Sequence, residues 1–298
     1  MPPAAVAGFP EGIDRIYLID PLGNYVLAWA STCPTDCSGR AKTAMRATWI
    51  LPRRLPPMRR NRRGAPMSAA RTDASAARRA RIVRLAGLYA VTPDVVDTAL
   101  LSLKVAAAIA GGAAALQYRN KSADAALRHD QARAIARLPA RARTLFIVND
   151  DAALAAVVDA DGVHVGADDA DIETARELVG PDRLIGVSCY GALERAYAAV
   201  EAGADYVAFG SFFESATKPA AQRADVGVLR RARSLAVPVV AIGGITASNA
   251  PLLIDAGATA VAVISDVFAS DDSAAITRAS AAIARAFATE SSLQSRSR

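Results

Sequence analysis

The chain has 298 residues, of which 52% are hydrophobic and only 5% aromatic, a balance typical of an alanine-rich α/β protein and not of a disordered chain. Its longest uncharged stretch near a helical pattern, residues 105–118, is shorter than the roughly 20 apolar residues that a membrane span needs. Residues 1–10 lack the basic region and apolar core of a secretory signal. We therefore expect a soluble, cytoplasmic protein without a membrane partner.

Residues 1–82 differ from the rest of the chain in charge and in pattern. They contain 14 Lys and Arg against 5 Asp and Glu, whereas residues 83–298 contain 21 against 24. Residues 15–20 and 25–29, on either side of a turn-like segment, predict a β-hairpin. Arginine pairs among prolines follow, a composition typical of a solvated tail. We expect residues 1–82 to be a mostly disordered extension that binds no nucleic acid. The functional chain is expected to start near Met67, so that the segment before it is dispensable.

From residue 83 onward, short apolar runs alternate with alanine-rich segments of helical periodicity, such as 95–110, 123–137 and 193–202. The runs are continuously apolar and do not alternate, as expected for strands that are covered on both sides by helices. The predicted strands are 87–91, 114–118, 145–148, 162–165, 184–187, 206–209, 239–242 and 260–263. Eight βα units predict a (β/α)8 TIM barrel over residues 83–288, followed by a disordered tail at 289–298. A Rossmann or flavodoxin-like sheet normally has fewer strands, and no Gly-x-Gly-x-x-Gly follows the first strand.

In this fold, functional residues are expected where each strand ends at its carboxyl side. The second strand ends in Gln117, Arg119 and Lys121, which alternate along the chain and therefore share one direction. Two cations and an amide donor on one side form a site for several phosphate oxygens. A solvated charged loop is the alternative.

Acidic residues follow the next two strands. Asp150 and Asp151 follow the third strand after Asn149, and Asp169 and Asp171 follow the fourth. Carboxylates on neighbouring strands can bind Mg2+, but aspartate is also favoured as a helix cap. We expect Asp150 and Asp169 to bind metal and the other two to cap helices.

The remaining strands end in hydroxyl groups, a lysine and glycines that suit anions. Strand five ends at Ser188, and no histidine follows it in sequence to activate a nucleophile. His164, inside strand four, is either a buried structural residue or next to substrate. Glycine after strand seven allows backbone N–H groups to approach a phosphate. The anion-binding candidates of strands six to eight are Ser215, Thr217, Lys218, Gly244 and Ser265.

The sequence therefore predicts two anion sites, one cationic and suited to a pyrophosphate with Mg2+, and one rich in backbone N–H groups and suited to a monophosphate. No catalytic nucleophile accompanies them. This combination suggests a reaction that joins two phosphorylated substrates with diphosphate as the leaving group.

An ordered set of motifs over residues 83–288 closely resembles thiamine-phosphate synthase. These motifs are Gly-Leu-Tyr-Ala-Val-Thr from residue 87, then Gln-Tyr-Arg-Asn-Lys, Val-Asn-Asp, Asp-Gly-Val-His-Val-Gly, Gly-Val-Ser, Ser-Ala-Thr-Lys-Pro and Ala-Ile-Gly-Gly-Ile. The resemblance implies a transferase that condenses 4-amino-2-methyl-5-(diphosphooxymethyl)pyrimidine with thiazole phosphate, giving thiamine phosphate and diphosphate. It implies Mg2+ as cofactor and dissociative loss of diphosphate. The alternative is a thiazole tautomerase or regulator-like paralogue on the same barrel, and a homo-oligomer is left open.

The resemblance also implies roles for individual residues. The diphosphate substrate would contact Gln117, Arg119, Lys121, Asn149, Ser188 and Lys218, of which Arg119, Lys121, Ser188 and Lys218 are the expected catalytic residues. Asp150 and Asp169 would bind Mg2+. Thiazole phosphate would contact Ser215, Thr217, Gly244, Ile264 and Ser265. The chain departs from the family pattern at Ala167, Tyr190, Ser211 and Ser215.

Overall fold

The computed structural model describes residues 15–19, 25–30, 67–166, 172–214 and 222–296. Two compact units, Met1–Gly64 and Ala65–Arg298, divide the chain. In the first unit, β1 (Arg15–Ile19) pairs with β2 (Tyr25–Ala30) in an antiparallel manner, the arrangement expected of a hairpin. Within the described ranges, no helix is long and apolar enough to cross a membrane.

The second unit is a TIM barrel. Its described strands close into a barrel of eight parallel strands in chain order, with the last strand pairing with the first. The strands are β3 (Gly87–Val91), β4 (Ala115–Tyr118), β5 (Leu145–Asn149), β6 (Gly162–Val165), β7 (Leu184–Tyr190), β8 (Tyr206–Gly210), β9 (Val239–Ile242) and β10 (Ala260–Val263). The predicted fold is confirmed, and each predicted strand overlaps an observed one.

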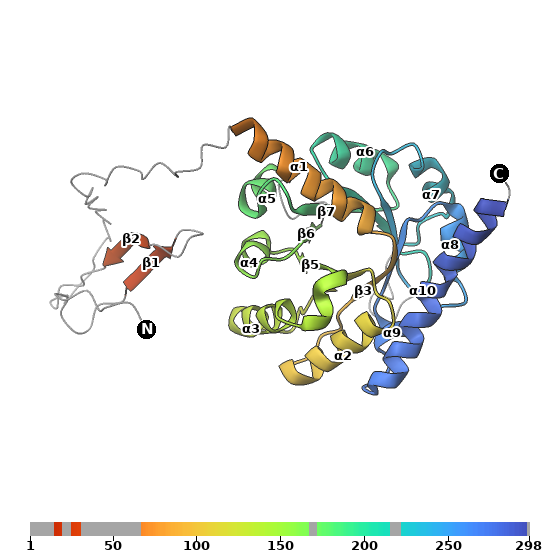
Figure 1. Cartoon of the computed structure of the whole chain (residues 1–298), viewed down its shortest axis with the longest axis horizontal. Helices are drawn as coiled ribbons and strands as arrows, with labels where there is room; N and C mark the ends of the chain where they lie inside the picture. The colour runs from red at the N-terminus through yellow and green to blue at the C-terminus, as the bar shows by residue number, and fades with distance from the viewer. Residues whose placement is uncertain (1–14, 20–24, 31–66, 167–171, 215–221, 297–298) are drawn as a thin grey trace, which may run out of the picture. The chain divides into compact units, whose positions relative to one another are not determined.

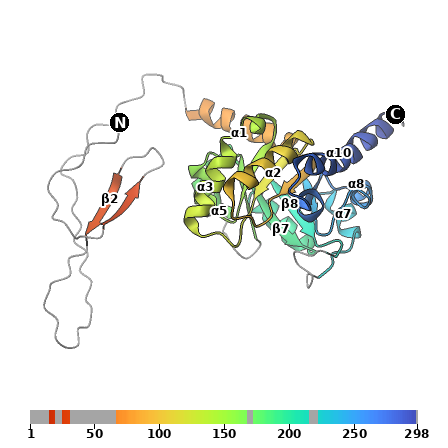
Figure 2. The ribbon, with the colours of Figure 1, turned by 90° about the horizontal axis from the view of Figure 1, so that it is seen from below.

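Helices surround the barrel, and the long C-terminal helix packs against α2 and α8 (Figures 1 and 2). The helices are α1 (Met67–Arg84), α2 (Thr98–Ala110), α3 (Ala125–Ala136), α4 (Ala152–Val157), α5 (Ile172–Val179), α6 (Leu193–Glu201), α7 (Gly227–Ala232), α8 (Ala250–Ala256), α9 (Ser265–Phe268) and α10 (Ser273–Arg296), with a 3-10 helix, η1, at Pro139–Arg143. Helix α10 extends beyond residue 288, where the sequence analysis expected the barrel domain to end.

Helix α1 belongs to the barrel unit, although most of its residues precede the expected boundary at residue 83. The Arg81 Nε atom lies 3.0 Å from an Asp161 carboxylate oxygen, and the Arg78 Nε atom lies 3.4 Å from one of Asp205. These aspartates directly precede β6 and β8, at the amino ends of the barrel strands. Helix α1 therefore contacts the end of the barrel opposite to the one where active sites form.

The barrel interior is filled by side chains that alternate along each strand. Tyr89, Leu145, Leu184, Tyr206 and Ala260 belong to one buried cluster inside the barrel. The residues between them along the strands belong to a second cluster shared with the helices. The interior of the described barrel is thus a packed core, and in this fold ligands bind at its carboxyl end.

Gly186 on β7 makes room for one of the two tyrosines of this interior cluster. A Cβ atom at this position would lie 1.9 Å from the Tyr206 ring. In the strand register, Gly186 pairs with His164 of β6 on one side and with Tyr206 of β8 on the other. The missing side chain lets His164 and Tyr206 meet across the strand that separates them.

Candidate active site

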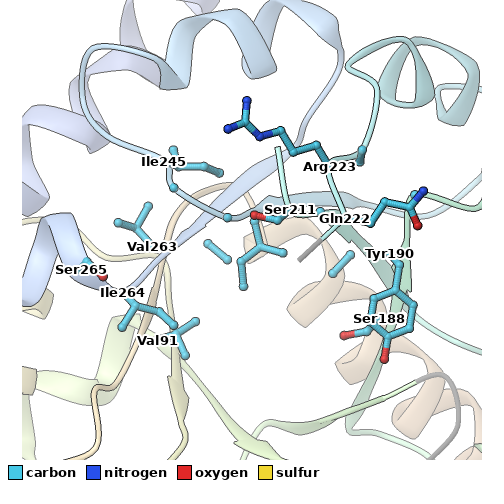
Figure 3. A pocket seen from close by; sticks show the side chains of 18 of the residues that line it. Val91, Ser188, Tyr190, Ser211, Gln222, Arg223, Ile245, Val263, Ile264 and Ser265 are labelled. Carbon is cyan, nitrogen blue, oxygen red and sulfur yellow. The ribbon is translucent and has the colours of Figure 1, made fainter. Parts of the chain in front are cut away.

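The loops that follow the barrel strands surround a cavity of about 1090 Å³. Ser188 and Tyr190 lie on one side of it, and Val263, Ile264 and Ser265 lie on the other (Figure 3). Of the predicted site residues, the cavity is lined by Gln117, Arg119, Asn149, Ser188, Gly244, Ile264 and Ser265. The structure therefore brings residues of both predicted anion sites to one cavity.

A second hollow, of about 590 Å³, adjoins the first. Arg119 and Asn149 line both hollows, while Lys121, Arg128 and Asp150 line only the second. Lys121 and Asp150 thus lie beside the main cavity and not within it. Arg119 and Asn149 connect the two spaces.

An aspartate that the sequence analysis did not single out organises the end of β4. The Arg119 Nη1 atom lies 3.2 Å from Asp94 Oδ1, and the side chain of Arg119 is only 14% exposed. The backbone N–H of Lys121 donates to the same carboxylate oxygen, with an N···O distance of 2.9 Å. Asp94 therefore holds both cationic residues of the predicted pyrophosphate site in place. The sequence feature that could have identified Asp94 is its place shortly after the first barrel strand, at the end of the barrel where functional residues are expected.

The two residues between Gln117, Arg119 and Lys121 have structural partners on α3. The Tyr118 hydroxyl donates to Gln131 Oε1 at 3.0 Å, and Asn120 Nδ2 donates to the same oxygen at 3.0 Å. Burial raises the pKa of Tyr118 to about 12, so its hydroxyl stays protonated as this bond requires. At this strand end, Gln117, Arg119 and Lys121 line the hollows, and the residues between them anchor the loop to α3.

The acids after β5 have different roles. Asp151 caps α4, since its Oδ1 accepts from the Leu154 backbone N–H at 2.8 Å, which confirms the predicted capping role. Asp150 has a positive φ of 60° and accepts from Asn149 Nδ2 at 2.7 Å. Asp169 and Asp171 lie outside the described residues. Among the residues that are described, no group of three or more His, Cys, Asp or Glu side chains is placed to hold a metal.

Two glycines after β9 allow the neighbouring loops to approach closely. Gly243 and Gly244 have φ values of 108° and 62°, a region that disfavours other residues. A Cβ atom at Gly244 would lie 2.1 Å from the carbonyl oxygen of Glu214. Three residues predicted for the loop after β8, Ser215, Thr217 and Lys218, lie outside the described part of the chain.

His164 is both buried and adjacent to the cavity, which combines the two alternatives that the sequence left open. Its Nε2 atom lies 2.9 Å from the Ser188 hydroxyl, and its Nδ1 atom lies 3.1 Å from the Tyr206 hydroxyl. Burial lowers the pKa of His164 to about 4, because the interior disfavours the charged imidazolium. The ring is therefore neutral near pH 7.

Comparison with known proteins gives the family. The family pattern described as thiamine monophosphate synthase matches residues 88–267. The chain belongs to this family. Thiamine-phosphate synthase from Thiobacillus denitrificans is 56% identical over 205 residues, which cover 68% of this chain and 96% of that protein. The corresponding protein from Chromobacterium violaceum is 54% identical over 196 residues, covering 66% of this chain and 95% of that protein.

A solved structure of this family has the same barrel. The thiamine phosphate pyrophosphorylase from Pyrococcus furiosus superposes with a TM-score of 0.61 at 34% identity, over 70% of this chain and 98% of the other. The match covers nearly the whole of that protein. The thiamine monophosphate synthase barrel therefore accounts for about two thirds of the present chain.

Several groups at the cavity of this family member were not predicted. Arg195 lies over the Tyr190 ring, with its guanidinium carbon 5.4 Å from the ring centroid, and both residues line the cavity. Arg223 also lines it and pairs with Glu214. In the sequence, an arginine that lines a cavity looks the same as an arginine on the solvated surface. The position of Arg195 and Arg223 at the cavity is therefore seen only in the folded structure.

Proposed function

We propose that this chain is a thiamine-phosphate synthase, an enzyme that joins a pyrimidine diphosphate to a thiazole phosphate and releases diphosphate. The observation that carries the proposal is the single cavity that has Gln117 and Arg119 at the end of β4, and Gly244 and Ser265 at the ends of the neighbouring strands β9 and β10. The first pair suits a diphosphate, and the second suits a monophosphate. The relatives named thiamine-phosphate synthase support coupling over the tautomerase alternative.

The chemical step breaks one bond and forms another. The carbon–oxygen bond to diphosphate breaks, and the oxygen keeps the electron pair, so a pyrimidine carbocation remains. The thiazole nitrogen then donates its lone pair to that carbon and forms the carbon–nitrogen bond. Neither step needs a general base, and the main task of the protein is to stabilise negative charge on the departing diphosphate.

Arg119 is the best-placed group for that task. Its guanidinium is largely buried, lines both hollows and is oriented by Asp94. A planar cation fixed in this way can hold two phosphate oxygens at once. Lys121 adds a second positive charge in the adjoining hollow. We expect Ser188 to donate a hydrogen bond, and Lys218, Ser215 and Thr217 to complete the two sites as the family pattern implies.

We further propose Mg2+ as the cofactor, held by Asp150 and Asp169. The exposed carboxylate of Asp150 lines the same hollow as Lys121 and Arg119, and oxygen donors of this kind suit a hard cation. When bound, Mg2+ would neutralise charge on the diphosphate. A cytoplasmic location and a homo-oligomer remain predictions.

The experiment is a coupling assay with the purified protein, both substrates, and either Mg2+ or EDTA. We expect thiamine phosphate and diphosphate with Mg2+ and a large loss of turnover with EDTA. Arg119→Ala should lower kcat/KM by about a hundredfold, the typical effect of removing a group that stabilises transition-state charge. Arg133→Ala, an exposed arginine on the outer helix α3, is the matched control and should retain activity. No detectable thiamine phosphate from the wild-type protein with Mg2+ would refute the proposal.

A further inference from the structure

A continuous chain of hydrogen-bonded side chains crosses the floor of the cavity, inside the barrel. It begins at Gln117 on β4 and ends at Ser188 on β7. Both ends line the cavity, and the two tyrosines in the middle are 2% exposed or less. The contacts are Gln117 Nε2 to Tyr89 Oη at 3.3 Å, Tyr89 Oη to Tyr206 Oη at 2.9 Å, Tyr206 Oη to His164 Nδ1 at 3.1 Å, and His164 Nε2 to Ser188 Oγ at 2.9 Å.

The amide at one end sets the direction of the whole chain. The nitrogen of the Gln117 side chain can only donate, so the Tyr89 oxygen accepts from it. Among the described residues, the Tyr89 hydroxyl has one further hydrogen-bond partner, the Tyr206 hydroxyl. The Tyr89 proton is therefore directed to the Tyr206 oxygen. A buried hydroxyl proton without an acceptor would be costly, so this orientation is strongly favoured.

The same logic continues through the second tyrosine. Because Tyr206 accepts from Tyr89, its own proton is directed to His164 Nδ1. Burial raises the pKa of Tyr206 well above its ordinary value, so the hydroxyl keeps the proton that it donates. His164 Nδ1 is thus an acceptor, and a neutral ring then carries its proton on Nε2.

From this arrangement we propose that His164 is a positioning residue, fixed as the Nε2–H tautomer, which donates to Ser188 and leaves the Ser188 hydroxyl proton for the bound substrate. The proposal rests on the proposed function only in naming that substrate, the pyrimidine diphosphate. Ser188 Oγ accepts from the ring, so its one proton points to another acceptor. The cavity that Ser188 lines is where such an acceptor would be bound.

Gly186 makes this arrangement possible. It lies between His164 and Tyr206 in the strand register, and any larger residue would occupy the space of the Tyr206 ring. The rings of His164 and Tyr206 have centroids 5.5 Å apart with an interplanar angle of 30°. The Tyr206 ring and the hydrogen bonds at both imidazole nitrogens therefore limit rotation of the imidazole and fix which nitrogen faces Ser188.

The first test observes the tautomer directly and needs no activity. The chain has two histidines, so His129→Gln leaves His164 as the only one. Imidazole 15N signals of this variant, measured near pH 7.5 and assigned by their couplings to the ring protons, should show a protonated Nε2 and an unprotonated Nδ1. In the added Tyr206→Phe variant, which lacks the donor to Nδ1, the two tautomers should interconvert. A wild-type ring protonated on Nδ1 would overturn the proposal, because Nδ1 would then donate to Tyr206 and Nε2 would accept from Ser188, which is the reverse of the proposed direction.

The second test asks whether Tyr206 and His164 act through Ser188. Tyr206→Phe should lower kcat by about tenfold, the scale of one lost hydrogen bond, and Ser188→Ala should lower it at least as much. The double variant should be no slower than Ser188→Ala alone, because the hydroxyl that the chain orients is already absent. Tyr197→Phe is the matched control, since it also removes a hydrogen-bonded tyrosine hydroxyl, 2.7 Å from Ser234 Oγ, but on the outer helix α6 and away from the cavity.

The outcomes of the two tests separate the proposals. If the Tyr206→Phe effect persists in full in the Ser188→Ala background, the tyrosine does not act through Ser188 and the positioning role is refuted. If the wild-type protein makes no thiamine phosphate, the proposed function fails. The 15N measurement still decides the tautomer in that case.

Discussion

The burial of a neutral histidine inside the barrel predicts a measurable dependence of stability on pH. The pKa of His164 is lowered by burial from 6.5 to about 4. Between these two values the unfolded chain binds a proton at this position and the folded chain does not. Acidification therefore favours the unfolded state, and stability that is fully present above pH 6.5 is lost as the pH falls toward 4. At about 1.4 kcal/mol per pH unit, the loss between pH 7 and pH 5 is about 2 kcal/mol.

The assay compares free energies of unfolding from urea titrations at pH 7 and pH 5. His164→Gln removes the titrating ring, so this variant should lose about 2 kcal/mol less than the wild-type protein over that interval. Its stability at pH 7 is expected to be lower, but only the difference between the two pH values enters the comparison. Changes from carboxylates occur in both proteins and cancel. His129→Gln, which removes the half-buried histidine on α3, is the control.

One result would contradict this reasoning. If the wild-type protein and His164→Gln lost the same free energy between pH 7 and pH 5, the ring would bind a proton in the folded state as readily as in the unfolded one. The imidazole would then be solvated or paired with an anion, and the buried hydrogen-bonded chain would not be present in solution.

Two further predictions concern packing at the floor and the amino end of the barrel. Gly186→Ala should reduce the free energy of unfolding, measured by urea titration, by about 3 kcal/mol, because the added Cβ atom would overlap the Tyr206 ring. Gly191→Ala is the control. Its Cβ atom would make an ordinary 3.5 Å contact, so the free energy of unfolding should fall far less. Deletion of residues 1–66 should leave coupling activity and the urea midpoint nearly unchanged, whereas deletion of residues 1–84 removes α1 and its contacts with Asp161 and Asp205 and should lower the midpoint clearly. Equal midpoints for the two truncated proteins would show that α1 contributes no stability.

The barrel strands could be predicted closely because each one is a short apolar run bounded by polar residues or glycine. Helix starts were less accurate. Residues 95–97 were expected to be helical, but α2 begins at Thr98 because the Asp97 carboxylate accepts from the backbone N–H groups of Ala99 and Leu100, at 2.7 and 3.1 Å. An aspartate inside an apolar periodic segment was thus a cap and not an interior residue.

Helix α1 shows why a basic composition does not by itself identify a disordered segment. Its arginines continue a basic segment that resembles a solvated tail. Two of them instead pair with aspartates that directly precede barrel strands, and Arg81 lies 80 residues from its partner Asp161. Local sequence contains no sign of a partner so distant. The basic residues of α1 are therefore part of the barrel's structure.

At the site, too, the residues at strand ends could be predicted from local sequence, whereas contacts between distant strands could not. The position of Gln117, Arg119 and Ser188 at the cavity could be predicted because each stands at the carboxyl end of a predicted strand. The hydrogen-bonded chain could not, because its members come from five strands and Tyr89 is 117 residues from Tyr206. Only barrel closure brings them together.

The resulting distribution of charge has a chemical consequence. The positive charges of Arg119 and Lys121 lie beyond the carboxyl ends of the strands, where the diphosphate is expected, while the floor is made of uncharged tyrosine, glutamine and histidine side chains. A protonated His164 would place a positive charge beneath a pyrimidine carbocation and repel it. Burial keeps the ring neutral, so the floor can orient the substrate by hydrogen bonds without raising the energy of the cation. The low pKa of His164 and the proposed dissociative step are therefore consistent with each other.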